Sequence, residues 1–170
     1  MTRWRDGNLS DFAEVGPKVA TLGEDAPFIA MADVGEWGRW ASPSGPRGNR
    51  SGICARGGDV LVARITPCLE NGKIAQVPKE LGDVGGSTEF IVLRAKPEVA
   101  LNDFVLLWQD RPTQQAAVSL MVGTSGRQRV AASDLAALPF AEQRRIVEVM
   151  SAVDVQTEAL EVESASVKRP

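Results

Sequence analysis

The residues of this chain that could carry out metal-assisted chemistry are few and unfavourably spaced. Asp59, Glu70 and Lys73 are of the types that hold Mg²⁺ and assist an attacking water in nucleases. Such a site needs the glutamate and the lysine at alternate positions of one strand, where both side chains share a face. Here Asn71-Gly72, a dipeptide typical of a tight turn, separates Glu70 from Lys73. A small Mg²⁺-dependent DNA nuclease is therefore the least favoured function that we consider.

The sequence lacks the residues on which nucleophilic catalysis usually depends. The chain has no histidine, which excludes Ser-His-Asp and Cys-His catalysis and histidine-ligated metal sites. Thr124 and Ser125 consequently have no general base, and Cys54 and Cys68 are interpreted as small core residues of a protein in the reducing cytosol. Phosphate-loop, dinucleotide-binding and amino-methyltransferase motifs are also absent from the sequence. We expect no catalytic residue, no metal, no cofactor and no enzymatic activity.

A loop rich in glycine, arginine and tryptophan is the segment best suited to contact a polyanion. Residues 35–52 contain five glycines and two prolines, which predicts a long loop rather than a helix or a central strand. Guanidinium groups contact phosphates and guanine edges, and indoles offer stacking surfaces. The loop carries both kinds of side chain, Arg39, Arg47, Arg50, Trp37 and Trp40. An equally favoured alternative is that the tryptophans fold back onto the core while the arginines are merely solvated.

The net charge of −3 conceals an uneven distribution of charge along the chain. Residues 37–66 contain five arginines and one acid, and residues 111–130 contain three arginines and no acid. Residues 141–163 contain six acids and two arginines. A polyanion would be attracted to the first two segments and repelled by the third.

Short apolar segments between glycine turns predict an α/β (α+β) domain built on a curved, mostly antiparallel sheet. Strands are expected at residues 28–34, 59–65, 73–77 and 88–94, and turns at 57–58, 71–72 and 82–86. Short helices are expected at 103–109, capped by Asn102, and at 113–121, between Pro112 and Gly123. A basic turn at 124–129, a return to the sheet at Val130 and a short turn capped by Ser133 follow.

The segment after Pro139 is expected to form one long helix. Residues 140–167 contain neither glycine nor proline, and alternating spacings of three and four residues predict an apolar stripe. A helix of about 26 residues would extend roughly 39 Å, so we expect it to protrude and pair as a coiled coil rather than lie back on its own sheet. The predicted partner contacts along the stripe are Ile146, Val149, Val153 and Leu160. The chain is thus divided into a body, residues 1–138, and a dimerisation or spacer helix, residues 139–170.

Composition places the chain among soluble globular proteins. Hydrophobic residues make up 44% and charged residues 24%, and no apolar run approaches the roughly 18 residues of a membrane-spanning helix. The segment Met1–Asp6 lacks the apolar core of a signal peptide. A cytoplasmic protein without membrane contact is expected.

Four stretches in this order resemble one protein family, the DNA specificity (S) subunits of type I restriction–modification systems. The first is Gly57-Gly-Asp-Val-Leu-Val-Ala-Arg-Ile-Thr-Pro67 with Glu70-Asn-Gly-Lys73, and the second is Gly86-Ser-Thr-Glu-Phe-Ile-Val-Leu-Arg94. The third is Gly123-Thr-Ser-Gly-Arg-Gln-Arg-Val130, and the fourth is Leu138-Pro-Phe-Ala-Glu-Gln-Arg-Arg-Ile-Val147. Each stretch is weak evidence alone, but together they cover about residues 27–160.

The resemblance implies a non-catalytic subunit with α/β target-recognition domains joined by long helices. In this family each domain reads one half of a split DNA sequence, and the helices act as spacers and dock methyltransferase subunits that use S-adenosylmethionine. A restriction subunit can join the complex. A full-length member has two domains and two such helices, whereas this chain has one of each. The expectation is therefore a natural half-subunit or a truncated form of a longer subunit. The half length suggests a homodimer through residues 140–167 that recognises a symmetric, interrupted site.

The resemblance also separates residues that read DNA from residues that support the fold. Motifs shared by proteins that read different sequences cannot be the readers, so Asp59, Glu89 and Gly126 are expected to be structural. Base reading is assigned chiefly to residues 35–52, while phosphate contacts set affinity and register. The predicted DNA contacts are Arg39, Arg47, Arg50, Lys73, Arg127 and Arg129, with Trp37 as a weaker candidate. The main alternative is a protein-interaction fragment that dimerises without reading DNA.

Overall fold

The computed structural model describes residues 5–18, 21–96 and 111–142. The chain divides into two compact units, one formed by Gly7–Phe140 and the other by Met1–Asp6 with Ala141–Pro170. Both four-stranded sheets and the described helices belong to the first unit. Within the described ranges, no helix has the length and apolarity that a membrane span requires.

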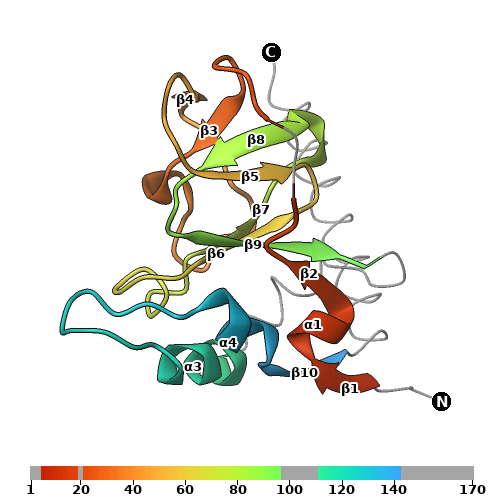
Figure 1. Cartoon of the computed structure of the whole chain (residues 1–170), viewed down its shortest axis with the longest axis vertical. Helices are drawn as coiled ribbons and strands as arrows, with labels where there is room; N and C mark the ends of the chain where they lie inside the picture. The colour runs from red at the N-terminus through yellow and green to blue at the C-terminus, as the bar shows by residue number, and fades with distance from the viewer. Residues whose placement is uncertain (1–4, 19–20, 97–110, 143–170) are drawn as a thin grey trace, which may run out of the picture. The chain divides into compact units, whose positions relative to one another are not determined.

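Two four-stranded sheets form the centre of the Gly7–Phe140 unit (Figure 1). The sheet that we call inner has the strand order β2 (Ala13–Val15), β9 (Phe90–Ala95), β6 (Val60–Ala63) and β7 (Ile74–Gln76), and all of its neighbours are antiparallel. The outer sheet has the order β4 (Gly45–Pro46), β3 (Pro27–Ile29), β8 (Asp83–Gly86) and β5 (Ile53–Arg56). Its β3 and β8 strands are parallel. Strands β1 (Arg5–Asn8) and β10 (Pro139–Glu142) pair separately.

The helices cover one face of the inner sheet. They are α1 (Leu9–Phe12), α3 (Arg111–Ser119) and α4 (Ala132–Ala136). Leu9, Phe12, Ala117 and Leu135 from these helices pack in one buried cluster with Val60, Val62, Ile91 and Leu93 from the inner sheet. Two short 3₁₀ helices, η1 (Met31–Asp33) and η2 (Lys79–Leu81), lie in the connections.

The opposite face of the inner sheet packs against the outer sheet. Leu61 and Ala63 alternate with Val60 and Val62 along β6, and they join a second buried cluster with Ile29, Ala55 and Val84 of the outer sheet. Because successive side chains of a strand point to opposite faces, both faces of β6 must be apolar. This explains why the strand is an unbroken apolar segment, Val60–Ala63, in which every residue is buried.

Most of the elements predicted from the sequence are confirmed, and the strands are shorter than expected. Strands β3, β6, β7 and β9 fall within or next to the predicted ranges, and α3 corresponds to the helix predicted at 113–121. The predicted second half of the 28–34 strand is instead the 3₁₀ helix η1. The single curved sheet of the prediction is replaced by two packed sheets, because the sequence pattern does not reveal β5 and β8 as strands.

The predicted turn at 82–86 is wrong beyond Gly82. Residues Asp83–Gly86 form β8, paired on both sides. Gly85 and Gly86 lie where atoms of neighbouring strands and of Arg47 approach the backbone closely. A Cβ on Gly85 would lie 3.2 Å from Phe28 Cδ2 and from Arg47 Cδ, and a Cβ on Gly86 would lie 2.9 Å from Ile53 Cδ1. Glycine therefore marks a crowded strand interior here rather than a reversal of the chain.

Two further expectations near the carboxyl end need correction. Ala131, and not Ser133, is the N-cap residue of α4. Residues 139–142, the first four of the predicted long helix segment, form β10. The rest of that segment, with the predicted partner contacts Ile146, Val149, Val153 and Leu160, lies outside the described residues, as does the helix predicted at 103–109.

A buried ion pair links the start of β6 to β9. The side chain of Asp59 is only 2% exposed, and Arg94 donates from Nε to Oδ1 at 2.8 Å and from Nη2 to Oδ2 at 2.7 Å. Asp59 Oδ2 also accepts a hydrogen bond from the backbone N–H of Arg56. The hydrogen bonds to Asp59 raise the pKa of Arg94 above its ordinary value. Asp59 is therefore structural, as expected from the sequence.

Replacing Asp59 by asparagine should lower the free energy of unfolding by about 3 kcal/mol, because it leaves the Arg94 charge without its buried partner. Urea denaturation followed by circular dichroism measures this change. The exposed Asp25 supplies the control, since Asp25→Asn should change the free energy by less than about 0.5 kcal/mol. Equal stability of the two variants would contradict a structural role for the Asp59–Arg94 pair.

Candidate nucleic-acid interface

The loop of residues 35–52 begins on the inner sheet and ends in the outer one. Glu36 forms an antiparallel bridge with Lys73, and Trp40 forms a parallel bridge with Gln76 of β7. The backbone N–H of Gln76 donates to Arg39 O at 2.8 Å, and that of Ala41 donates to Gln76 O at 3.0 Å. The loop thus covers the free edge of β7 before it continues into β4. Hydrogen bonding of this edge explains how a segment without regular structure holds a defined path.

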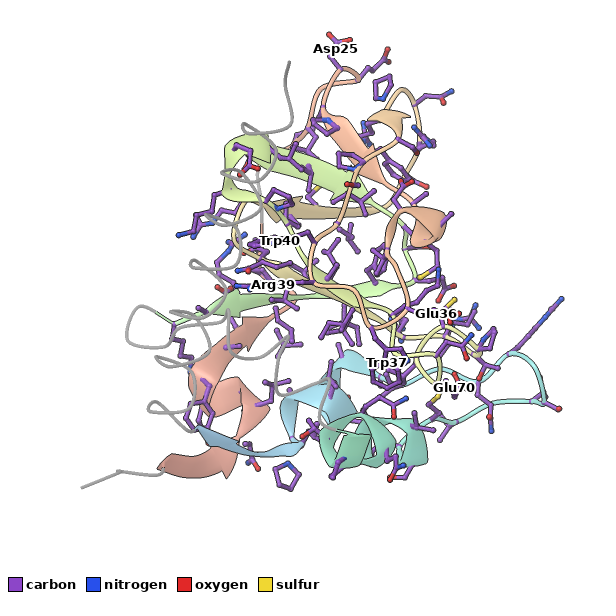
Figure 2. The ribbon with its side chains drawn as sticks, turned by 180° about the vertical axis from the view of Figure 1, so that it is seen from behind. Asp25, Glu36, Trp37, Arg39, Trp40 and Glu70 are labelled. Carbon is purple, nitrogen blue, oxygen red and sulfur yellow. The ribbon has the colours of Figure 1, made fainter. Side chains whose placement is uncertain are left out.

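Trp37 lies against the Asn71-Gly72 turn. A Cβ placed on Gly72 would come within 2.6 Å of the indole atoms Cδ2 and Cε2, so the ring packs directly over the glycine. The backbone N–H of Trp37 donates to Gly72 O at 3.2 Å. Figure 2 shows Trp37 near Glu36 and Glu70, on a different part of the loop from Arg39 and Trp40. The indole remains 37% exposed, so Trp37 is only partly folded back onto the body.

Lys73 is engaged by the protein itself. Its Nζ donates to Met31 O at 3.0 Å, and its backbone pairs with Glu36 at the start of the loop. The predicted DNA contact therefore has a structural partner, and its charge lies at the junction of the loop and the β6–β7 turn.

Arg39 and Arg50 each stack on an aromatic ring. Arg39 Cζ lies 5.0 Å from the centre of the Trp40 ring, and Trp40 is 43% exposed. Arg50 Cζ lies 4.1 Å from the centre of the Phe28 ring, while its Nε donates to Arg47 O at 3.0 Å and its Nη2 donates to Pro46 O. Stacking and hydrogen bonds limit the rotamers of a guanidinium. Both arginines are thus pre-positioned cations on the loop.

Arg47 joins the loop to the outer sheet. Its Cδ packs over Gly85 of β8, and its Nη1 lies 3.4 Å from Gly48 O and 3.5 Å from Leu22 O. Its backbone N–H donates to Ala26 O at 2.7 Å. The residue therefore also holds the loop to the segment before β3, a role that the sequence did not indicate.

A second basic segment, residues 122–129, forms a hairpin that we call the basic hairpin. Val122 and Arg129 exchange backbone hydrogen bonds of 3.0 and 2.9 Å, and Arg127 N–H donates to Thr124 O. Residues 122–127 are all exposed. The N–H of Thr66 donates to Gln128 O at 3.0 Å, so the hairpin lies beside the β6–β7 connection. The expected basic turn is confirmed, with Arg127 exposed on it.

Arg129 holds the base of the basic hairpin to the sheet. Its Nε and Nη2 donate to the two carboxylate oxygens of Glu89 at 2.9 and 2.8 Å. These hydrogen bonds lower the pKa of Glu89 below its ordinary value; burial partly opposes the shift, and the charges of Arg129 and Arg64 reinforce it. The same bonds raise the pKa of Arg129. The fork-to-fork geometry makes Glu89 structural, as expected, and occupies part of the Arg129 guanidinium.

The nuclease constellation is not assembled. Asp59 is paired with Arg94, Lys73 Nζ is bonded to Met31 O, and Glu70 Oε1 accepts from Thr66 Oγ1 at 2.7 Å. Across residues 5–18, 21–96 and 111–142, no group of three or more histidine, cysteine or acidic side chains is placed to hold a metal ion. Each member of the proposed set is thus committed to a different structural bond.

Sequence reasoning missed the residues that join the loop to its support. Asn71 Nδ2 donates to Glu36 Oε1 at 2.9 Å, and Gly72 supplies the surface under Trp37. Asn71-Gly72 is recognisable as a turn from its residue types. Its contact with residues 36 and 37 has no signal in the sequence, because the two segments are far apart along the chain.

Comparison with known proteins gives a consistent set of relatives. The specificity subunit of the type I restriction enzyme EcoEI from Escherichia coli is 28% identical in an alignment of length 176, gaps included, that covers 95% of this chain and 29% of that protein. The EcoAI specificity subunit from the same organism is 32% identical over 97 residues, 53% of this chain and 16% of the relative. This chain therefore spans less than a third of the length of either curated relative. No family model matches the sequence.

Solved structures share the fold. The HsdS subunit from Thermoanaerobacter tengcongensis superposes with a TM-score of 0.65 at 23% identity, covering 96% of this chain and 45% of that one. The type I restriction-modification S subunit from M. genitalium gives a TM-score of 0.58 at 15% identity, covering 95% and 41%. A chain from a study of assembly and conformational transition in the type I R-M system gives 0.61 at 19% identity, covering 96% and 41%. The mixed α+β architecture of this chain is thus that of S subunits.

The pair Glu89–Arg129 predicts a specific effect on titration. Arg129→Ala should raise the pKa of Glu89 toward its ordinary value, because the fork of hydrogen bonds is lost. Because the folded pKa lies below the unfolded one, the pair stabilises the fold above the unfolded pKa and loses this effect as pH falls through the folded pKa. Carboxyl-carbon NMR titration measures the shift. Arg127→Ala, in the same hairpin, should leave Glu89 unchanged, and an unshifted Glu89 in Arg129→Ala would contradict the assignment.

Proposed function

We propose that this chain, which is homologous to type I restriction enzyme specificity subunits by sequence and structure, is a non-catalytic DNA sequence-recognition subunit of a type I restriction–modification system. The observation that carries the proposal is the 28% identity to the EcoEI specificity subunit across 95% of this chain. That similarity extends over nearly the whole chain rather than over one short motif.

The arrangement of cations supports a division of work between two surfaces. Residues 35–52, which we now call the reading loop, present Arg39 and Arg50 on aromatic rings. A pre-positioned guanidinium suits bidentate contact with a guanine edge. The basic hairpin presents Arg127 on an exposed turn, within one of the four stretches that resemble the specificity-subunit family. A position common to proteins that read different sequences suits sequence-independent contact with phosphate.

The structure changes the weight of the individual candidates. Lys73 and Arg129 use their side-chain donors on protein groups, and Arg47 packs over β8. Their positive charge still adds to the local potential. Arg50 and Arg127 are exposed, and Arg39 stacks on the exposed Trp40. Arg50 also donates to Arg47 O and Pro46 O, but both acceptors are uncharged carbonyls and its side chain is exposed. We therefore expect Arg50 and Arg127 to make the larger contributions to DNA binding.

The finer features of the family enter as part of the same proposal. We propose that the chain reads one half of a split target and docks the methyltransferase subunit, with a restriction subunit as a further partner. Pairing of two copies through residues 140–167 would supply the second half-site. A cytoplasmic location follows from contact with DNA and with these partners.

Selection from a library of randomised duplexes, with and without the cognate methyltransferase subunit, tests the function. Enrichment of an interrupted sequence, and co-elution of the two subunits in size-exclusion chromatography, are the expected results. Dimerisation without any duplex enrichment would instead support the protein-interaction alternative. Mg²⁺-dependent cleavage of DNA would support a nuclease.

Two arginine variants should separate phosphate contact from base contact. Arg127→Ala should weaken binding to every duplex similarly and reduce the slope of log K against log salt by about 0.9, the value for one lost phosphate contact. Arg50→Ala should cost about 1–3 kcal/mol for the selected duplex and relax the preference at one position. Fluorescence anisotropy over a range of salt concentrations measures both effects.

The exposed Arg56 of β5 provides a matched control for these variants, because it lies outside the reading loop and the basic hairpin. Arg56→Ala should leave the salt slope and the sequence preference close to those of the wild type. If Arg50→Ala and Arg127→Ala behave alike on all duplexes, the division of work between the two surfaces is wrong.

A further inference from the structure

Trp37 has an unusual backbone for its residue type. Its φ is +56°, and within the described ranges it is the only residue other than glycine with a positive φ. Such a conformation is uncommon for a bulky side chain and persists only where the surroundings determine it. The surroundings of Trp37 therefore indicate what holds the start of the reading loop.

Four contacts join the start of the reading loop, or the segment just before it, to the turn between β6 and β7. The indole packs over Gly72, and the Trp37 N–H donates to Gly72 O at 3.2 Å. Glu36 Oε1 accepts from Asn71 Nδ2 at 2.9 Å. Lys73 Nζ donates to Met31 O at 3.0 Å, just before the loop. Three consecutive residues of the turn thus each hold one residue in or before the loop.

We infer that Trp37 is a positioning residue for DNA discrimination: its indole, packed on Gly72, sets where the arginine-bearing part of the reading loop begins. The inference rests on the proposed function. It separates Trp37 from the side chains that touch DNA, because the same ring that the sequence offered as a stacking surface has one face on the protein. The hydrogen bonds from Asn71 to Glu36 and from Lys73 to Met31 O reinforce the attachment.

The position of the loop matters more for base contacts than for phosphate contacts. A bidentate bond to a base edge requires a guanidinium at a defined place and angle, whereas a phosphate attracts a cation over several ångströms. Displacing Trp37 should therefore reduce discrimination between duplexes while leaving the sequence-independent part of binding, which the basic hairpin supplies, largely unchanged.

Gly72 allows Trp37 to be displaced without altering any residue of the loop. In Gly72→Ala the new Cβ would lie 2.6 Å from two indole carbons, so the ring must move. Gly72 has a φ of +68°, which alanine also disfavours, and Gly82 provides the control for that strain. Gly82 has a φ of +63°, and no atom lies within 4 Å of the position that a Cβ would take there. Gly82→Ala therefore carries a backbone penalty, to which its ψ of −135° adds, without the clash.

Amide hydrogen exchange on the free 170-residue chain tests the attachment directly. Residues 38–50 should exchange faster in Gly72→Ala than in Gly82→Ala. In a Trp37→Ala background, adding Gly72→Ala should cause no more than the increase that Gly82→Ala causes, because the ring that it displaces is absent. Equal exchange in the two glycine variants, or full additivity with Trp37→Ala, would overturn the inference.

Anisotropy with the duplex selected by the wild type and a scrambled duplex tests the consequence for DNA. Gly72→Ala should lower the ratio of the two affinities by about tenfold, comparable with one lost base contact, with an unchanged salt slope. Gly82→Ala should keep the wild-type ratio. Equal weakening on both duplexes would overturn the positioning role. A wild type that selects no duplex would refute the proposed function, whereas the exchange comparison would still decide the attachment of the loop.

Discussion

Burial of the inner sheet on both faces is the constraint on which the rest of the structure depends. Alternate residues of β6 and β9 serve two separate cores, one shared with the helices and one shared with the outer sheet. With both faces covered, only the edges and turns of this sheet can reach the surface. The β7 edge carries the start of the reading loop, and the connections at the ends of its strands carry the Asn71-Gly72 turn and the support for the basic hairpin. The surfaces proposed to contact DNA are therefore attached to a sheet that packing holds on both sides.

Arginines have two roles in this chain, and an ion pair with an acidic side chain distinguishes the structural role from the other. Arg94 and Arg129 are held by Asp59 and Glu89, and each pair joins segments that are distant in sequence. Arg50 stacks on the Phe28 ring and donates to two backbone carbonyls, which restrict the guanidinium without neutralising its charge. A ring by itself leaves a cation able to attract a polyanion, whereas a carboxylate cancels that charge. The chemistry of the supporting group thus separates structural arginines from candidate DNA contacts better than position in the sequence does.

The candidate site was only partly predictable. The long loop at residues 35–52, its arginines, and the basic turn at 124–129 follow from composition and are confirmed as structural features, except that Gly45–Pro46 within the loop form the edge strand β4. The packing of Arg47 over Gly85, the bond from Lys73 to Met31 O, and the packing of Trp37 on Gly72 do not. Each of these depends on a contact between residues that the sequence separates widely, and residue type alone gives no information on such pairs.

The sequence by itself indicated the strands β3, β6, β7 and β9, since short β-branched and apolar runs bounded by glycine and proline favour a sheet. It also determined the absence of histidine chemistry and, through four short stretches, the family resemblance. Only the tertiary structure decided that there are two sheets rather than one, because Gly85 and Gly86 permit the close packing that makes β8 a strand. It likewise decided which cations are engaged, because hydrogen-bond partners are set by proximity in space and not along the chain.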